Sequence, residues 1–272
     1  MKQKIEKINK ILNSNKDFRI QNNSYCFLAG DRLPASTSGE GLLAKIQEKC
    51  KQNGRLYNLL VNIFSPVFIT SDFKKQINIL LTQYNSNDVI LNLGSGPDIL
   101  KTRKDIINVD IFAFDNVDIV ADAEDLPIRD NSVDLVINRA MMEHVKNPEK
   151  VVACIHRILK ANGEALIYIP FIQPFHAAPH DYCRWTLEGS RQLLSDFRTK
   201  KIRIGAGPTS GMLWVFQKWL AILLSFGSKY LHDIIFLSLM IITAPIKLLD
   251  IILVHFPNAE KISSGFFIIV RK

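Results

Sequence analysis

Val89-Ile-Leu-Asn-Leu-Gly-Ser-Gly-Pro97 is an apolar run that ends abruptly in Gly-x-Gly, and Ile106-Ile-Asn-Val-Asp-Ile111 follows shortly after it. The first run predicts a buried parallel strand leading into a tight turn, and the second predicts a strand that ends on the carboxylate of Asp110. Glycine lets the backbone of the turn approach a ligand, and Asp110 can accept hydrogen bonds from both hydroxyls of a ribose. The two runs together predict a pocket for a nucleotide cofactor.

Two kinds of ligand compete for this pocket. A dinucleotide fold requires G-x-G-x-x-G before a helix whose N-terminus meets a pyrophosphate, whereas this turn continues Pro97-Asp98-Ile99-Leu100 without a third glycine. Because Asp98 stands where phosphate would lie, a phosphate ligand is disfavoured. S-adenosylmethionine has the same ribose and adenine but carries an amino-acid tail and a sulfonium cation instead of phosphates, so an acid near its tail is tolerable.

The following stretches continue the pattern. Asp118-Ile-Val-Ala-Asp-Ala-Glu-Asp-Leu-Pro127 places Asp122 just after a third apolar strand, and Asp130-Asn-Ser-Val-Asp-Leu-Val-Ile-Asn138 supplies a fourth strand. With these motifs in register, the chain from about Asp88 to Ala206, together with its last strand, resembles the class I S-adenosylmethionine-dependent methyltransferases of the type 11 group. The resemblance implies an α/β fold with a Rossmann-like sheet, mostly parallel with an antiparallel last strand.

The resemblance also implies a role for each motif of the pocket. It assigns the methionine tail of S-adenosyl-L-methionine to Leu93, Gly94, Ser95 and Gly96, the ribose to Asp110, the adenine to Ile111, Asp122 and Ala123, and the pocket floor to the backbone near Asn138 and Arg139. Two positions depart from the family, because Asn92 replaces an acid and Asp98 replaces the third glycine. A protein of this fold that has lost catalysis and a Rossmann domain for another nucleotide remain alternatives.

Acceptor chemistry is expected between Phe171 and Trp185, after a fifth strand, because ligands of open α/β sheets bind outside the carboxyl ends of the strands. A hydroxyl acceptor needs a base, for which the candidates are His144, His176 and His180. Each also has a structural alternative, namely anchoring a loop or bonding backbone carbonyls. Asp181 and Arg184 are expected to orient a base, hold an anionic acceptor or pair with each other. No metal site is expected, since prolines at 170, 174 and 179 argue against a helix aligning His176 with His180.

A hydrophobic segment separates the last two predicted strands, 201–205 and 264–271. The family fold would connect them by a short hairpin, whereas here residues 207–262 intervene as an apolar helical insertion between strands 6 and 7. Its runs 213–226 and 234–254 predict two helices, but charged residues and a proline interrupt them, so lying in a membrane interface is favoured over spanning a bilayer. The contact is expected within 212–254, and a lid or a dimer face is the alternative.

Composition limits the remaining possibilities. A chain of 272 residues with 47% hydrophobic residues can form one large domain, for which the expected parts are 1–86, 87–206 plus 263–272, and 207–262. The net charge of +8 arises largely from scattered lysines, with a concentration in 1–10, where a solvated helix face or a fraying terminus is expected; attraction to an anionic membrane surface would also explain the excess charge. No nucleic-acid partner is expected, because no compact basic-aromatic stripe appears. The cysteine spacing and the lack of a secretory signal predict reduced thiols and a cytoplasmic location, either free or peripheral on the inner face of the cell membrane.

The first 86 residues are predicted to contain helices at 39–50, 54–63 and 71–83 and a short strand at 25–28. The whole pattern favours methyl transfer to an oxygen of a lipid-linked or surface-polysaccharide (glycan) acceptor. A small soluble metabolite or a quinone-like lipid as acceptor, or a non-catalytic S-adenosylmethionine-binding module, are the alternatives.

Overall fold

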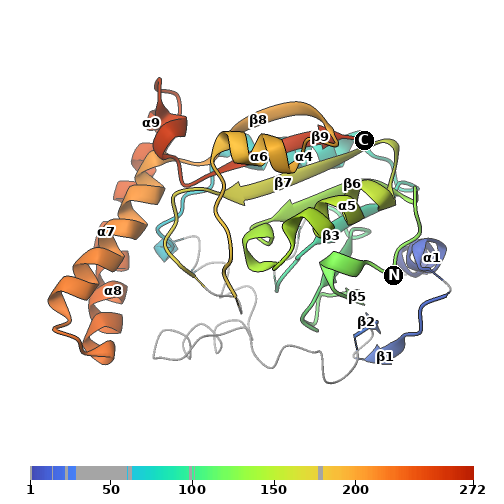
Figure 1. Cartoon of the computed structure of the whole chain (residues 1–272), viewed down its shortest axis with the longest axis horizontal. Helices are drawn as coiled ribbons and strands as arrows, with labels where there is room; N and C mark the ends of the chain where they lie inside the picture. The colour runs from blue at the N-terminus through green and yellow to red at the C-terminus, as the bar shows by residue number, and fades with distance from the viewer. Residues whose placement is uncertain are drawn as a thin grey trace.

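Nine strands form one sheet in the part of the chain that the computed structural model describes, residues 2–13, 15–21, 24–28, 60, 63–97, 100, 102–176 and 180–272 (Figure 1). The strand order is β1-β2-β5-β4-β3-β6-β7-β9-β8. The strands are β1 Arg19–Gln21, β2 Ser24–Cys26, β3 Ile90–Leu93, β4 Ile107–Asp110, β5 Ile119–Val120, β6 Val133–Arg139, β7 Leu159–Pro170, β8 Arg198–Ala206 and β9 Gly265–Arg271. The helices predicted at 39–50 and 54–63 lie outside the described residues, except for residues 60 and 63.

The centre of the sheet is parallel from β2 through β5, β4, β3 and β6 to β7, whereas β9 runs antiparallel to both β7 and β8. This arrangement confirms the predicted Rossmann-like methyltransferase sheet, which is mostly parallel with an antiparallel last strand. The sequence did not indicate that β1 and β2 would form an additional hairpin, which extends the sheet beyond β5.

Both faces of the central strands are covered, which explains their continuous apolar runs. On one face, Leu91, Val109 and their neighbours form a core with α5 (Pro148–Ile158). On the other face, Ile90 and its neighbours form a core with α4 (Ser71–Gln83), which has the predicted bounds. The sheet therefore forms the middle of three layers, with α4 and α5 on opposite sides (Figure 1).

The N-terminal helix α1 (Lys2–Ile11) is fixed to the amino ends of the central strands. Lys7 donates to the carbonyl oxygen of Asp88 at 2.6 Å and to the Asp105 carboxylate at 2.8 Å, and Lys4 pairs with Asp118 at 2.7 Å. The expectation of a solvated face or a fraying terminus is therefore wrong for Lys7, which is only 6% exposed. Its ammonium is buried because a carboxylate and a carbonyl replace its hydration.

Helices occupy the chain between β8 and β9 and extend as an arm beyond the end of the sheet (Figure 1). They are α7 Pro208–Leu224, α8 Lys229–Thr243, the 3-10 helix η4 Ile246–Leu249, α9 Asp250–Leu253 and η5 Ala259–Ile262. The second apolar run, predicted as one helix over 234–254, is instead divided after Thr243 near Pro245, because proline lacks an amide hydrogen and disrupts a helix.

Among the described residues, no single helix has the length and hydropathy to cross a membrane. Only the pair Lys229–Thr243 and Ile246–Leu253, bent by 46°, passes by length and composition.

Two of the charged residues that interrupt the apolar runs are buried and hydrogen-bonded. Asp250 is fully buried and accepts hydrogen bonds from the amides of Thr209 and Ser210 at 2.8 and 2.9 Å, which caps the N-terminus of α7. Lys247 is 4% exposed and donates to the carbonyl oxygens of residues 63 and 65. These charges therefore connect the arm to itself and to the preceding chain instead of facing solvent.

Candidate active site

The predicted cofactor residues lie at one edge of the sheet, because the parallel strands that carry them end together. Leu93 at the end of β3 pairs with Asn138 in β6 and with Val109 in β4, while Asp110 pairs with Val120 in β5. The turn after β3 is thus placed between the ends of β4 and β6. The structure brings the predicted glycine turn and the predicted ribose acid together.

The turn itself depends on two glycines with left-handed backbones. Gly94 has φ +68° and Gly96 has φ +56°, and the amides of Gly94 and Ser95 both donate to the carbonyl oxygen of Val109. A Cβ atom on Gly94 would lie 2.5 Å from Cγ of Met141, whereas a Cβ on Gly96 would meet none of the described residues within 4 Å. Gly94 is therefore required by protein packing, while Gly96 faces open space in which a ligand can approach the backbone.

Asp110 is held in a fixed orientation by backbone amides. Its Oδ2 accepts from the Gly96 amide at 2.7 Å and its Oδ1 accepts from the Phe112 amide at 2.9 Å. Burial raises the pKa of Asp110, and the hydrogen bonds from Phe112, Gly96 and Ile111 oppose that shift. A carboxylate has about four lone-pair sites, so with three amide donors it can still accept from a hydroxyl.

Amide side chains support the same turn. Asn92 donates to Oδ1 of Asn108 at 3.0 Å, Asn108 donates to the carbonyl of Asn116, and Asn116 donates to the carbonyl of Gly96 at 3.0 Å. The residue that replaces the family's usual acid therefore supports the turn indirectly, through two further asparagines.

The other predicted cofactor residues surround this turn. Asp122 is exposed just after β5 and caps the 3-10 helix η2 (Ala123–Asp125) through the amide of Glu124 at 2.9 Å, while Ala123 is buried. Ile111 is half-buried beside Asp110, and Arg139 is half-buried at the end of β6. Their assignment to adenine and to the pocket floor stays a prediction.

The predicted acceptor segment after β7 is held in place by Arg184. The guanidinium donates to both oxygens of Asp181 and to the carbonyls of Gln173, Pro174 and Cys183. Asp181 in turn accepts from the His176 amide at 2.7 Å. Arg184 lowers the pKa of Asp181, against the effect of burial. These two residues therefore pair with each other, which was one of the alternatives.

Two of the three candidate histidines converge on a buried acid. Nε2 of His144 and Nε2 of His176 each lie 3.8 Å from Oε1 of Glu143, which is 0% exposed. Glu143 and His144 belong to the 3-10 helix η3 (Met142–His144), which follows β6 after Ala140, a residue with φ +51°. The His180 ring is exposed and packs against Tyr182, with centroids 5.6 Å apart, outside this group. We call Glu143, His144 and His176 the His–Glu cluster.

Sequence reasoning missed Glu143 as a site residue. The available signal was its position, since an acid directly before a candidate histidine follows the end of β6 at the ligand-binding edge. What could not be foreseen is that the segment after β7 folds back over it: the Tyr182 amide donates to the Glu143 carbonyl at 2.7 Å.

A family model described as a methyltransferase domain, the type 11 group, matches residues 98–167. The matched segment, residues 98–167, therefore carries part of a class I S-adenosylmethionine-dependent methyltransferase domain. No curated protein matches this chain.

Solved structures to which the chain is similar include the [4+2]-cyclase SpnF, at 14% identity over 82% of this chain and 96% of that chain with a TM-score of 0.45. Another is phosphoethanolamine N-methyltransferase 2 of Haemonchus contortus in complex with S-adenosyl-L-methionine. It is 15% identical over 86% of this chain and 60% of that chain, with a TM-score of 0.47.

The edge of the methyltransferase sheet fits S-adenosylmethionine. Asn138 is fully buried and its Nδ2 donates to the carbonyl of Leu93 at 3.0 Å, but its Oδ1 has no hydrogen-bond partner among the described residues. A buried acceptor without a donor fits the ammonium group of the methionine tail. Gly96 leaves room for that tail, and Asp110 presents a carboxylate suited to the ribose hydroxyls.

Proposed function

We propose that this methyltransferase acts on an oxygen atom of a lipid-linked or surface-polysaccharide acceptor at the cytoplasmic face of a membrane. When S-adenosylmethionine is bound, methyl transfer breaks its sulfur–carbon bond and forms a bond from that carbon to the acceptor oxygen. Gly94, Gly96, Asp110 and Asn138 would hold the cofactor at the sheet edge. The observation that carries the choice of oxygen is the His–Glu cluster.

A hydroxyl acceptor must lose its proton, which an aliphatic or aromatic amine in its neutral form need not do before attack. The His–Glu cluster offers imidazole nitrogens, whose ordinary pKa is near neutrality, beside a buried carboxylate. In this proposal the hydroxyl proton passes to the cluster, and Glu143 stabilises the positive charge that results. Holding the acceptor in place is the other contribution, and well-oriented reactants lower a barrier by about 7 kcal/mol or more.

Helix α7 connects the acceptor segment with the apolar arm. The ring of Trp214 in α7 lies 4.8 Å from the ring of His176, and Gly211 in the same helix packs closely against Ile172. The residues that follow Trp214, Val215 and Phe216, are exposed. Helix α7 therefore contacts the His–Glu cluster through Trp214 and carries exposed apolar residues at the next two positions, which suits an acceptor that is anchored in a membrane.

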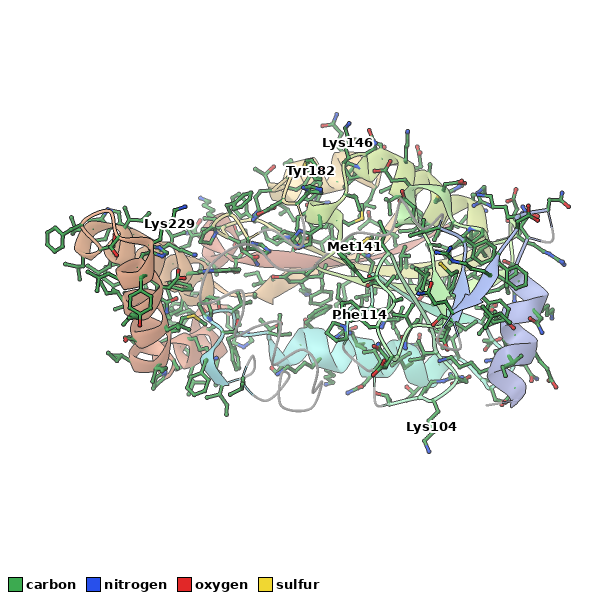
Figure 2. The ribbon with its side chains drawn as sticks, turned by 90° about the horizontal axis from the view of Figure 1, so that it is seen from below. Lys104, Phe114, Met141, Lys146, Tyr182 and Lys229 are labelled. Carbon is green, nitrogen blue, oxygen red and sulfur yellow. The ribbon has the colours of Figure 1, made fainter. Side chains whose placement is uncertain are left out.

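The outer surface of the arm is apolar over most of its length. The exposed large side chains are Met212, Val215, Phe216, Trp219, Ile222, Leu223, Leu224, Phe226, Tyr230, Leu231, Ile234, Ile241, Ile242, Ile246, Leu248, Leu249, Ile251, Ile252 and Phe256. Phe226 at the tip is 90% exposed, and Figure 2 labels Lys229 at that end of the molecule. A continuous apolar surface of this kind marks an interaction site.

Charge favours a lipid surface as its occupant. The only acidic residues from 212 to 256 are Asp233, which is half-buried, and Asp250, which is fully buried. Lys229 is exposed beside Phe226 and Tyr230, and the chain carries a net charge of +8. Aromatic and basic residues around an apolar face are typical of segments that lie in the interface of an anionic bilayer.

Flotation with vesicles tests the membrane contact. The full chain should float with phosphatidylcholine–phosphatidylglycerol vesicles, and a Trp219→Ser, Phe226→Ser, Ile242→Ser variant should remain at the bottom of the gradient. A Phe18→Ser, Ile20→Ser variant is the matched control, because these residues are also exposed but lie far from the arm. If the wild type does not float, or if both variants lose flotation equally, the arm does not bind membrane.

The acceptor is tested by incorporation of a labelled methyl group from S-adenosylmethionine into cell extract separated into lipid, glycan and protein fractions and a small-molecule fraction. Label should appear in lipid or glycan as a methyl ether or ester, and Glu143→Gln should reduce it. Label in the small-molecule fraction would instead support a soluble metabolite as acceptor. Cofactor binding without any labelled product would support the non-catalytic module.

A further inference from the structure

Three ligand-type atoms of the His–Glu cluster lie within 4.8 Å of one another, namely a carboxylate oxygen of Glu143 and a ring nitrogen from each of His144 and His176. We propose that this cluster binds a divalent transition-metal ion, for which zinc is the probe. Imidazole and carboxylate ligands suit Zn²⁺, and three protein ligands leave a position open, as in catalytic sites.

The hydrogen bonds of Arg184 determine which ring nitrogen of His176 carries its proton. A guanidinium has five N–H groups. Here Nε donates to Gln173, Nη1 to Asp181 and Cys183, and Nη2 to Pro174 and Asp181. No hydrogen of Arg184 is left for Nδ1 of His176, although Nη2 lies 3.0 Å from it.

Nδ1 of His176 must therefore be the donor in its 2.9 Å contact with the carbonyl oxygen of Pro174, because a carbonyl can only accept. The same reasoning applies to His144, whose Nδ1 lies 2.6 Å from the carbonyl oxygen of His180. In both neutral rings the lone pair is then on Nε2, which is the nitrogen that faces Glu143. Metal-binding histidines are commonly oriented in this way, by donation from the second ring nitrogen to a carbonyl.

Glu143 supplies the second, independent observation. Its side chain is completely buried, and neither carboxylate oxygen has a hydrogen-bond partner among the described residues. A buried carboxylate without a donor is costly and needs a compensating charge. With both Nε2 atoms as acceptors, three acceptors converge on one point, and a cation satisfies all of them.

The separations also fit an ion better than a proton. Each Nε2 lies 3.8 Å from Oε1 of Glu143, which is too long for a hydrogen bond. Two ligands bound to one Zn²⁺ at about 2.1 Å with tetrahedral angles lie about 3.4 Å apart. The two His–Glu separations would therefore contract by about 0.4 Å, and the separation of the two ring nitrogens, which is at most 4.8 Å, would close to the same value.

When a cation is bound, the Nε2 atoms are its ligands and no longer accept the hydroxyl proton. The cation would instead lower the pKa of an acceptor hydroxyl bound at the open position, and the proton would leave to solvent water; this role, unlike the binding itself, rests on the proposed function. His180 contributes only its backbone to the site, which explains why the pairing of His176 with His180 considered from the sequence did not indicate it. The partners of His176 are Glu143 and His144, which follow β6 and not β7.

Metal binding is measured on the full chain after dialysis against a chelator, by titration calorimetry with Zn²⁺ and by the visible absorption of Co²⁺. We expect saturable binding of a single equivalent and a Co²⁺ spectrum of tetrahedral type. Glu143→Gln, which keeps the side-chain volume, and His176→Ala should each weaken binding more than the roughly 10–100-fold typical of losing an outer partner. His232→Ala is the matched control, since His232 also lies beside a carboxylate, at 3.2 Å from Asp233, but in the arm.

Absence of saturable binding by the wild type, or equal affinity of wild type and Glu143→Gln, would overturn the proposal. Thermal unfolding without metal shows that the variants are folded, and added Zn²⁺ should raise the melting temperature of the wild type alone among wild type, Glu143→Gln and His176→Ala. Failure of the two proposals is distinguishable. Zinc binding without any labelled methyl product refutes the function only, whereas labelling of a hydroxyl acceptor by a protein that shows no saturable zinc binding refutes the metal site only.

Discussion

Replacing Gly96 by alanine tests two roles of the glycine turn, namely its left-handed backbone conformation and the space that it leaves for the cofactor. The left-handed backbone, with φ +56°, costs a non-glycine residue about 1–2 kcal/mol. None of the residues that the structure describes lies within 4 Å of the new Cβ, so they add no steric term to that cost. At about 2–4 °C per kcal/mol for a chain of this size, the melting temperature should fall by about 2–8 °C. The methyl group would occupy the open space beside the backbone, so the affinity for S-adenosylmethionine should fall by at least about tenfold, or ~1.4 kcal/mol.

The control for this substitution is Gly227→Ala at the tip of the arm. Gly227 has φ +84° and its Cβ would also meet nothing within 4 Å, so the backbone penalty is matched while the cofactor edge is untouched. Thermal denaturation and calorimetry with S-adenosylmethionine are the assays. If Gly96→Ala binds the cofactor like Gly227→Ala and the wild type, the cofactor does not approach the turn and the placement of the pocket is wrong.

Three further changes have defined outcomes. Asp250→Ala should lower the free energy of unfolding by about 2 kcal/mol or more in denaturant titration, since the α7 amides lose a buried cap; a loss below ~0.5 kcal/mol would contradict this. Gly94→Ala should be more destabilising than Gly96→Ala, and Met141→Ala in the same chain should recover part of the loss, which a double-mutant cycle measures; strict additivity would exclude the clash. Hydrogen bonds from Arg103, then Lys7, hold the pKa of Asp105 well below its usual range. The ionised Asp105 therefore stabilises the fold above about pH 4, and this contribution is lost as the pH falls through the lower pKa of the folded state. The stability difference between wild type and Asp105→Asn should therefore shrink in acid, and a difference independent of pH would refute the pairing.

The sheet could be predicted because the residue pattern of each central strand indicates how that strand is buried. Strands buried on both faces must be apolar throughout, and the glycines and Asp110 mark where they end. Register followed from the parallel arrangement, so Asp110 and the glycine turn were placed together without any knowledge of side-chain packing. The same reasoning gave α4 its bounds, since Thr70 caps it and its apolar positions recur with helical spacing.

The acceptor side could not be predicted to the same depth. Glu143 becomes a site residue only because the chain after β7 returns to it, a contact between residues about 40 positions apart that leaves no local pattern. Lys247 and Asp250 were interpreted as interruptions of apolar helices, since hydropathy counts charges without knowing whether a partner neutralises them. Their burial leaves the outer surface of the arm more apolar than its composition suggests.

Helix α1 has a consequence for handling the protein. Through Lys4 and Lys7 it fastens the starts of the same strands whose far ends form the nucleotide pocket. Removing α1 would loosen the starts of these strands, one strand length away from the pocket. The pocket would keep all of its residues, but the distance between the glycine turn and Asp110 would no longer be fixed. A loss of cofactor affinity in such a truncated protein would be a defect of alignment and not of recognition.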